Sequence, residues 1–359
     1  MEIGSIFEIE PTNLFINQKH DIPLLPVQKR EGLYACYFNT GRTAIEMVLK
    51  KLKREGFVNL LIPSFVCDSV RDAALRAEMN LVYYRVNKDL SVDVSTIKME
   101  KQSILYVVQF FGQRINQEFL SRISHLQHLG VVVIEDISLS LFSNDEKYVG
   151  FGDYIIGSLR KWIPIIDGGI LLSKNQEQFD LINESNDYTL YYYTAQILKG
   201  VYLNSKKRNQ NWKQTFLSYN SDGIKALFSD YTPRKISRVS LDLMRGVDFN
   251  RVIEKRNQNY DTLYSLLLAI PQIRILVQRK GTMTPLGMVI LSEERDDLLQ
   301  YLISKDIYCN VHWHSNESTK EFPESEYLAK RCITIPCDQR YGDDEMRYIY
   351  HSIRDFYGE

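Results

Sequence analysis

The sequence predicts an α/β fold: a large domain with a mainly parallel sheet flanked by helices, followed by a smaller α+β domain. Short runs rich in Val, Ile and Tyr alternate with helical stretches in the first half of the chain, which is typical of βαβ units. The chain has 359 residues, and domains usually contain about 100–200 residues, which favours two domains. We place the division at residues 1–235 and 236–359.

The composition excludes several classes of protein. A formal net charge of -1 gives no reason to expect a nucleic-acid partner. No apolar run approaches the roughly 18 residues that span a bilayer, so we expect no membrane span. Five cysteines without a C-x-x-C pair, and an N-terminus without a secretory signal, predict a cytoplasmic protein without disulfide bonds.

The large domain is predicted to begin with an extended arm over residues 1–30. A helix follows near residues 43–53, where apolar residues recur at helical spacing and Gly56 provides a stop. Further helices are expected near residues 68–77 and 117–129. The expected strands lie at residues 60–62, 81–86, 104–110, 131–134, 154–156 and 170–172.

The pattern changes after residue 182. Residues 183–230 predict a helical excursion that includes a solvated basic turn at Lys206–Arg208, and residues 237–267 predict mostly helix. The smaller domain then has expected strands at residues 273–277, 287–291 and 307–311. Helices are expected near residues 294–303 and 343–356.

A first candidate site is the turn at Phe38–Ala44, which leads into a helix. Gly41 and the free amides of a helix start can cradle a phosphate, and Thr43 adds a hydroxyl. The same residues also suit a simple helix N-cap, and this segment alone favours the cap.

A second candidate is the buried run that ends in Glu135-Asp136. A carboxylate at the end of such a strand can keep a pyridinium nitrogen protonated, so that the ring becomes an electron sink. An aspartate at that position can equally cap the next element.

A third candidate is Ser158-Leu159-Arg160-Lys161, which follows an expected strand and precedes Asp167-Gly168-Gly169. A lysine there can form a Schiff base, and the serine can bind a cofactor phosphate. The alternative is a surface Arg-Lys pair, but the next three residues, Trp162 to Pro164, are apolar.

The order of these segments resembles the DegT/DnrJ/StrS-type sugar aminotransferases, which are fold-type-I enzymes dependent on pyridoxal phosphate (PLP). The resemblance runs from about Tyr34 to the C-terminus. The matching residues also include Pro63-Ser64-Phe65, Phe110-Phe111-Gly112, Arg256 with Asn259-Tyr260, Val311-His312-Trp313 and Ile335-Pro336.

The resemblance implies a role for each matching residue. Lys161 would be the Schiff-base lysine and proton shuttle, and Asp136 would pair with the pyridine nitrogen. The cofactor phosphate would be bound by Gly41, Arg42, Thr43 and Ser158. The ring would stack on Phe65 or Cys67, with Ser138 nearby. A loop of the partner subunit would reach the phosphate through Thr232, at the family's asparagine position, and Arg234, which implies a homodimer with shared sites.

The sequence departs from the family at two places. Leu139 stands where the family has Gln or His near the ring, and the gap between Ser158 and Lys161 is shorter than usual. In the family, the region of His312, Trp313 and His314 lines the substrate mouth. The two histidines lack a complete ligand set, so no metal is predicted.

The resemblance implies transfer of an amino group from an amino acid, glutamate, to a keto-sugar nucleotide in polysaccharide biosynthesis. Leu139 leaves two alternatives within the same fold: dehydration, or transamination of a non-sugar ketone. A third hypothesis is a non-enzymatic PLP-fold regulator, which the presence of both Asp136 and Lys161 disfavours because folding requires neither.

Overall fold

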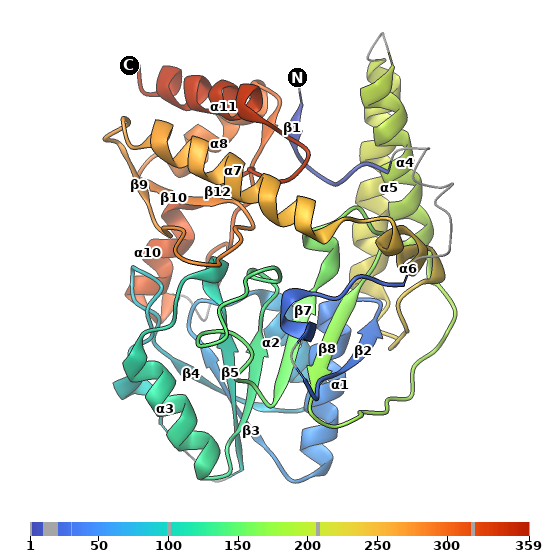
Figure 1. Cartoon of the computed structure of the whole chain (residues 1–359), viewed down its shortest axis with the longest axis vertical. Helices are drawn as coiled ribbons and strands as arrows, with labels where there is room; N and C mark the ends of the chain where they lie inside the picture. Colours follow the sequence, from blue (N-terminus) through green and yellow to red (C-terminus); the bar gives the residue numbers. More distant parts are fainter. Residues whose placement is uncertain are drawn as a thin grey trace.

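The computed structural model describes residues 2–9, 21–29, 31–98, 102–205, 209–316 and 320–358. A large sheet with helices forms the lower part of Figure 1, and a smaller domain lies above it. The predicted basic turn at Lys206–Arg208 lies outside the described residues, as does much of the predicted N-terminal arm. No helix in the described ranges is both long and apolar enough to cross a membrane.

The large sheet has seven strands in the order β2-β8-β7-β6-β5-β3-β4. Strands β3 to β7 run parallel, and β8 is antiparallel to its neighbours β7 and β2. The mainly parallel sheet confirms the predicted fold class. The strands are β2 (Tyr34–Phe38), β3 (Asn59–Pro63), β4 (Asn80–Tyr84), β5 (Ser103–Val108), β6 (Val132–Asp136), β7 (Tyr154–Ser158) and β8 (Gly169–Ser173).

The central strands are buried on both faces. Every residue of β5, β7 and β8 is buried, and the adjacent Ile155 and Ile156 belong to different hydrophobic clusters. This follows from the alternation of side chains along a strand, with packed elements on each face. The helices that follow the first strands are α1 (Gly41–Arg54), α2 (Asp68–Arg76) and α3 (Gln117–His128).

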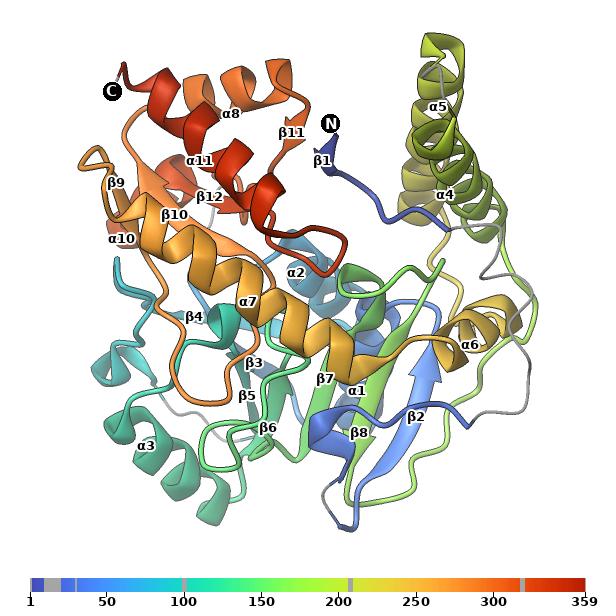
Figure 2. The same ribbon diagram turned by 45° about the horizontal axis from the view of Figure 1, so that its top comes forward.

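The predicted helical excursion is a pair of helices, α4 (Asp187–Asn204) and α5 (Gln210–Ser229), which lie side by side and stand away from the sheet (Figures 1 and 2). The helical pattern of residues 237–267 forms two helices, α6 (Arg238–Arg245) and α7 (Phe249–Leu267). The break falls at Asp248, whose carboxylate accepts hydrogen bonds from the amides of Asn250 and Arg251 and so starts α7.

The smaller domain contains an antiparallel sheet in the order β12-β10-β9, which packs with α7, α8 and α11 around one hydrophobic cluster. The expected strand at residues 307–311 is shorter than predicted, because β11 ends at Tyr308 and only an isolated bridge follows at Asn310. The elements are β9 (Ile273–Ile275), β10 (Met288–Ser292), α8 (Arg295–Ser304), β11 (Ile307–Tyr308), α10 (Pro323–Arg331), β12 (Cys332–Ile335) and α11 (Asp343–Phe356).

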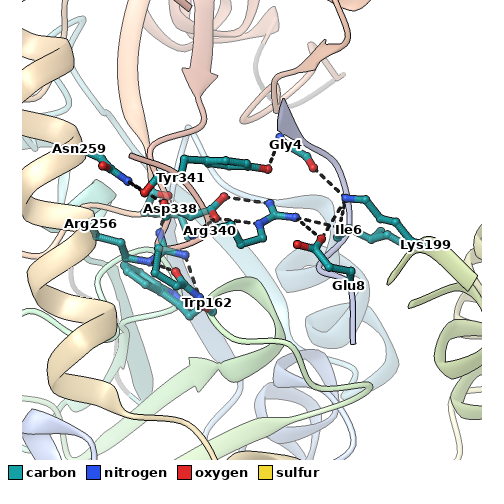
Figure 3. A network of polar contacts seen from close by, with 12 residues as sticks. Gly4, Ile6, Glu8, Trp162, Lys199, Arg256, Asn259, Asp338, Arg340 and Tyr341 are labelled. Atoms are coloured by element: carbon teal, nitrogen blue, oxygen red, sulfur yellow. Dashed lines mark hydrogen bonds and ion pairs between the residues drawn. The ribbon is translucent and has the colours of Figure 1, made fainter. Parts of the chain in front are cut away.

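The N-terminal segment joins the two parts of the molecule. Strand β1 (Ile3–Gly4) pairs in parallel with β11 of the smaller domain, although the sequence groups the arm with the large domain. Residues 4–8, which we call the strap, then pass between α4 and the smaller domain (Figure 3). The division after residue 235 stays a prediction.

Candidate active site

A pocket with a volume of about 180 Å³ lies where β5, β6 and β7 end and α1 begins. Ligands bind at this edge in open α/β sheets, because loops diverge there and helix N-termini face the space. Leu139 and Arg160 line the pocket, together with residues of α5. The predicted site residues that line it are Gly41, Arg42, Cys67, Asp136, Ser138, Ser158, Lys161 and Trp313.

Asp136 ends β6, and its carboxylate is held by two donors. The Ser138 amide donates to Oδ1 at 2.8 Å, and the Tyr106 hydroxyl donates to Oδ2 at 2.8 Å. Tyr106 comes from the neighbouring strand β5 and is fully buried. The signal for this contact in the sequence is a lone tyrosine within the apolar run of residues 104–108.

Glu135 points to the opposite face of β6 and has a structural role. Its carboxylate accepts hydrogen bonds from Gln109 and from the amides of Gly150 and Gly152. Burial raises the pKa of Glu135, while these donors oppose the shift. Side chains alternate between the two faces of a strand. Glu135 therefore holds a loop on one face of β6, while Asp136 lines the pocket on the other.

Lys161 ends the short 3-10 helix Leu159–Lys161 directly after β7. The next residue, Trp162, is fully buried, and its indole N–H donates to the Ser138 carbonyl at 3.0 Å. Its carbonyl accepts hydrogen bonds from Arg256 at 3.3 Å and Gln339 at 2.8 Å. The backbone beside Lys161 is therefore fixed to the Asp136 loop on one side and to α7 on the other.

The start of α1 satisfies both interpretations of that segment. The Thr40 hydroxyl caps the helix by accepting the Thr43 amide at 3.0 Å, and the two hydroxyls lie 2.9 Å apart. The amides of Gly41 and Arg42 have no hydrogen-bond partner within the described ranges. Two free donors at the positive end of a helix dipole suit an anion. A Cβ at Gly169 would lie only 2.3 Å from the Thr40 backbone, so β8 approaches this turn closely.

Arg42 is buried beside the pocket and lies against the end of α5. Its guanidinium donates to the Leu227 carbonyl and stands 5.3 Å from the ring centre of Phe228 and 4.8 Å from that of Tyr231. Burial, with the nearby Arg76 as a second cause, lowers the pKa of Arg42. Helix α5 therefore forms one wall of the pocket, a contact that no motif in the sequence indicated.

Residues 30–354 match the profile of the DegT/DnrJ/EryC1/StrS aminotransferase family. The chain belongs to this family. No curated protein sequence is significantly similar to this aminotransferase. The family, the fold type and the prediction of a PLP-dependent aminotransferase are thereby confirmed.

Solved structures of low sequence identity share the fold of this aminotransferase. The PLP form of Spr1654 from Streptococcus pneumoniae, whose proposed activity is that of a sugar aminotransferase, has a TM-score of 0.71 at 14% identity and covers 99% of this chain and 98% of its own. DesV of S. venezuelae, in complex with a ketimine intermediate, has a TM-score of 0.63 at 13% identity (90% and 85% covered). A GDP-4-keto-6-deoxy-D-mannose-3-dehydratase of E. coli has a TM-score of 0.63 at 14% identity and covers 89% of this chain and 87% of its own.

The residues of this aminotransferase fit the PLP that its family uses. The pocket brings together a lysine, an aspartate whose carboxylate is already oriented, and the start of α1 with two unpaired amides. These match the aldehyde, the ring nitrogen and the phosphate of the cofactor in chemical type.

Six predicted residues of this aminotransferase lie within the described ranges but outside the pocket lining: Thr43, Phe65, Thr232, Arg234, His312 and His314. Phe65 is fully buried and supports Trp313, with ring centres 5.1 Å apart. Burial, followed by the neighbouring Lys161 charge, lowers the pKa of His312 to about 3, and its Nδ1 lies 2.9 Å from the Thr334 hydroxyl. His314 is exposed. No group of three metal-binding side chains occurs within the described residues.

Proposed function

We propose that this chain transfers an amino group from glutamate to the carbonyl carbon of a keto-sugar nucleotide. Glutamate would leave as its keto acid, and the sugar carbonyl oxygen would be replaced by the amine. The observation that carries the proposal is the joint placement of Lys161 and Asp136 in one pocket beside the free amides of α1. The fold alone would need neither side chain.

Each residue then has a chemical task. PLP, when bound, supplies an electron sink for the carbanion that forms at the donor Cα. Lys161 Nζ would take and return the proton at that carbon. Asp136 would keep the ring nitrogen protonated, and its two donors, the Ser138 amide and the Tyr106 hydroxyl, would fix its orientation. Gly41, Arg42 and Ser158 would hold the phosphate.

The choice of substrate rests on the family and on the pocket wall. Trp313 and Phe228 line the pocket, and Phe228 is 53% exposed, so an apolar ring face is accessible to a bulky substrate. Leu139 adds a buried apolar side chain at the position where the family has a polar one. The proposal includes the keto-sugar nucleotide as amino acceptor, a role in polysaccharide biosynthesis and a cytoplasmic location.

The proposal includes a homodimer with shared active sites. Phe228 at the pocket and Tyr231 beside Arg42 are exposed, Tyr231 by 39%, and a partner subunit would border them and leave the pocket side of Phe228 free for the substrate. Within this chain the Arg234 guanidinium donates to Asp230 and to the Glu184 carbonyl. Sedimentation of the PLP-loaded protein should give a dimer, whereas a monomer that turns over would contradict shared sites.

The assay that tests the function uses purified PLP-loaded protein, glutamate and a panel of 4-keto-6-deoxy sugar nucleotides, with product masses as the readout. We expect an amino sugar and the keto acid of glutamate in equal amounts. Loss of water from the sugar would instead support the dehydratase alternative. Amination of a non-sugar ketone, or no turnover of any ketone, would overturn the sugar assignment.

A further inference from the structure

We propose that Arg160 binds the phosphate group of the cofactor, as a cation that supplements the amides at the start of α1. The residue precedes Lys161 and lines the same pocket as Gly41 and Ser158. This inference rests on the PLP dependence of the family and on no assumption about the sugar. Its test is therefore independent of the assay for the proposed function.

The guanidinium of Arg160 is held in place by α4. It lies 5.9 Å from the ring centre of Tyr188 and 5.8 Å from that of Tyr192. The two rings are stacked on each other, with centres 5.4 Å apart and planes at 22°. The Tyr188 hydroxyl donates to the Ile166 carbonyl at 2.9 Å, which anchors this pair to the large domain. A long side chain that is preordered in this way loses little entropy when it binds a ligand.

Arg160 carries a charge that is not neutralised by a carboxylate of the described residues. In the described ranges no Asp or Glu side chain forms an ion pair with it, and its interactions are with tyrosines. The neighbouring tyrosines, Tyr188 first, raise the pKa of Arg160, and an arginine guanidinium is always protonated in a protein. A partly buried charge without a counterion is unfavourable unless a ligand neutralises it.

The charges of the pocket favour the phosphate as that ligand. The charged residues that line it are Arg42, Arg160, Lys161 and Asp136. Asp136 would be neutralised by the protonated ring nitrogen, and Lys161 would be joined to the cofactor. The two arginines then remain, and a phosphate ester carries a charge of about -1.5 to -2 near neutral pH. Of the charges that this chain itself supplies to the loaded pocket, both arginines together bring the sum close to neutral, whereas Arg42 alone leaves about one excess negative charge.

Equilibrium binding to the apoprotein tests this assignment, with PLP and pyridoxal as the two ligands. Pyridoxal lacks the phosphate but keeps the aldehyde and the ring. In Arg160→Gln we expect the PLP dissociation constant to rise roughly 10- to 100-fold, because a hydrogen bond between two charged groups is lost. The pyridoxal constant should stay within about 2-fold, and Arg160→Lys should recover part of the PLP affinity because it keeps the charge.

Two further measurements make the outcomes decisive. Inorganic phosphate should raise the melting temperature of the wild-type apoprotein more than that of Arg160→Gln. Arg245→Gln, which removes an arginine paired with Asp242 on α6, controls for the loss of a positive charge elsewhere. Equal weakening of PLP and pyridoxal would overturn the proposal. Unchanged PLP affinity with a raised KM for glutamate would also overturn it and would assign Arg160 to the donor carboxylate.

Discussion

Two lysines of this chain, Lys161 in the pocket and Lys199 on α4 beside the strap, differ in what their ammonium groups contact. Burial, with Arg340 as a second cause, lowers the pKa of Lys199 to about 8, a value that would suit a nucleophile. Its ammonium group, however, is occupied by the carbonyls of Ile6 at 2.6 Å and Gly4 at 3.2 Å and by Glu8 at 3.3 Å. Only Lys161 lies beside an oriented aspartate.

The arginines of the two regions differ in the same way. Near the strap, Arg340 pairs with Asp338 and Glu8 and donates to the Ile6 carbonyl (Figure 3). In the pocket neither Arg42 nor Arg160 forms an ion pair with a carboxylate of the described residues. At the strap, carboxylates neutralise the buried cation, whereas the pocket leaves its two arginines without a carboxylate partner, as an anionic ligand requires. The predictions below test this distinction.

The largest effect on stability is expected from Arg256→Met. Arg256 is fully buried and donates to Gln339 and to the carbonyls of Pro285, Leu286 and Trp162. Methionine fills similar space but leaves several buried acceptors without a donor, so the free energy of unfolding should fall by about 3–5 kcal/mol. Urea unfolding of the apoprotein measures this change.

Arg251→Met is the matched control for that prediction, because Arg251 is exposed on the same helix, α7. We expect it to change the free energy of unfolding by less than about 0.5 kcal/mol. Equal effects of the two substitutions would show that the contacts of Arg256 do not hold the smaller domain against Trp162.

The second prediction concerns the rate. Asp136→Asn keeps the shape of the side chain but removes the charge beside the ring nitrogen, while the phosphate contacts remain. We expect near-normal PLP content and a slowing of the single-turnover conversion of PLP to pyridoxamine phosphate by about 100- to 1,000-fold. Asp153→Asn is the control, because Asp153 directly precedes β7 and lies at the end of that strand away from the pocket. It should leave the single-turnover rate unchanged. If Asp136→Asn reacts at the wild-type rate, Asp136 serves only to cap the loop that follows β6.

The third prediction is a pH dependence that arises from Lys199. The folded protein releases the Lys199 proton near pH 8, whereas the unfolded chain holds it up to its ordinary pKa of 10.5. The unfolded chain therefore binds more protons in between, so the contribution of Lys199 to stability rises from pH 8 to 10.5 and is lost as the pH falls through 8. Relative to Lys199→Met, the wild type should gain about 1–3 kcal/mol over this window.

Urea unfolding of both proteins at pH 7.5, 9 and 10.5 measures the gain, since the other titrating groups are common to the two chains and largely cancel. A difference between the proteins that does not change with pH would mean that Lys199 keeps its proton through its contacts with Glu8 and the strap carbonyls.

The smallest effect is expected from Tyr106→Phe, which removes one of the two donors to Asp136. A hydrogen bond to a charged group contributes about 1.5 kcal/mol, so the same single-turnover rate should fall roughly 10-fold, with little change in PLP content. Combined with Asp136→Asn, the substitution should add little, because the charge that Tyr106 orients is already absent. Full additivity would place Tyr106 in an independent role.

The sequence predicted the large sheet well, because its strands are short apolar runs with helices between them. It missed β2, β12 and α10, and it extended β11 to Val311. Strand β2 consists only of apolar and aromatic residues, so the sequence did contain a strand signal at this edge of the sheet. The short β11 and the pairing of β1 with it depend on contacts between residues about 300 positions apart, which local patterns do not contain.

The sequence predicted those site residues that belong to short motifs along the chain. Gly41, Asp136, Ser158 and Lys161 lie at or next to the ends of predicted elements, and the structure places all four at one pocket. The residues that support them come from elsewhere: Tyr106 from the next strand, Arg256 from α7, and the tyrosines beside Arg160 from α4. Such contacts depend on tertiary packing, so apart from the lone tyrosine in the apolar run of β5 the sequence contains no signature of them.

The central claim is that Lys161, and not Lys199, whose pKa burial lowers, bonds to the cofactor. The direct test is borohydride reduction of the PLP-loaded protein, followed by digestion and mass mapping of the phosphopyridoxyl group. We predict the modification on the peptide that contains Lys161, and its absence, together with loss of the visible absorbance band, in Lys161→Ala. Modification of Lys199, or an unchanged band in Lys161→Ala, would contradict the account.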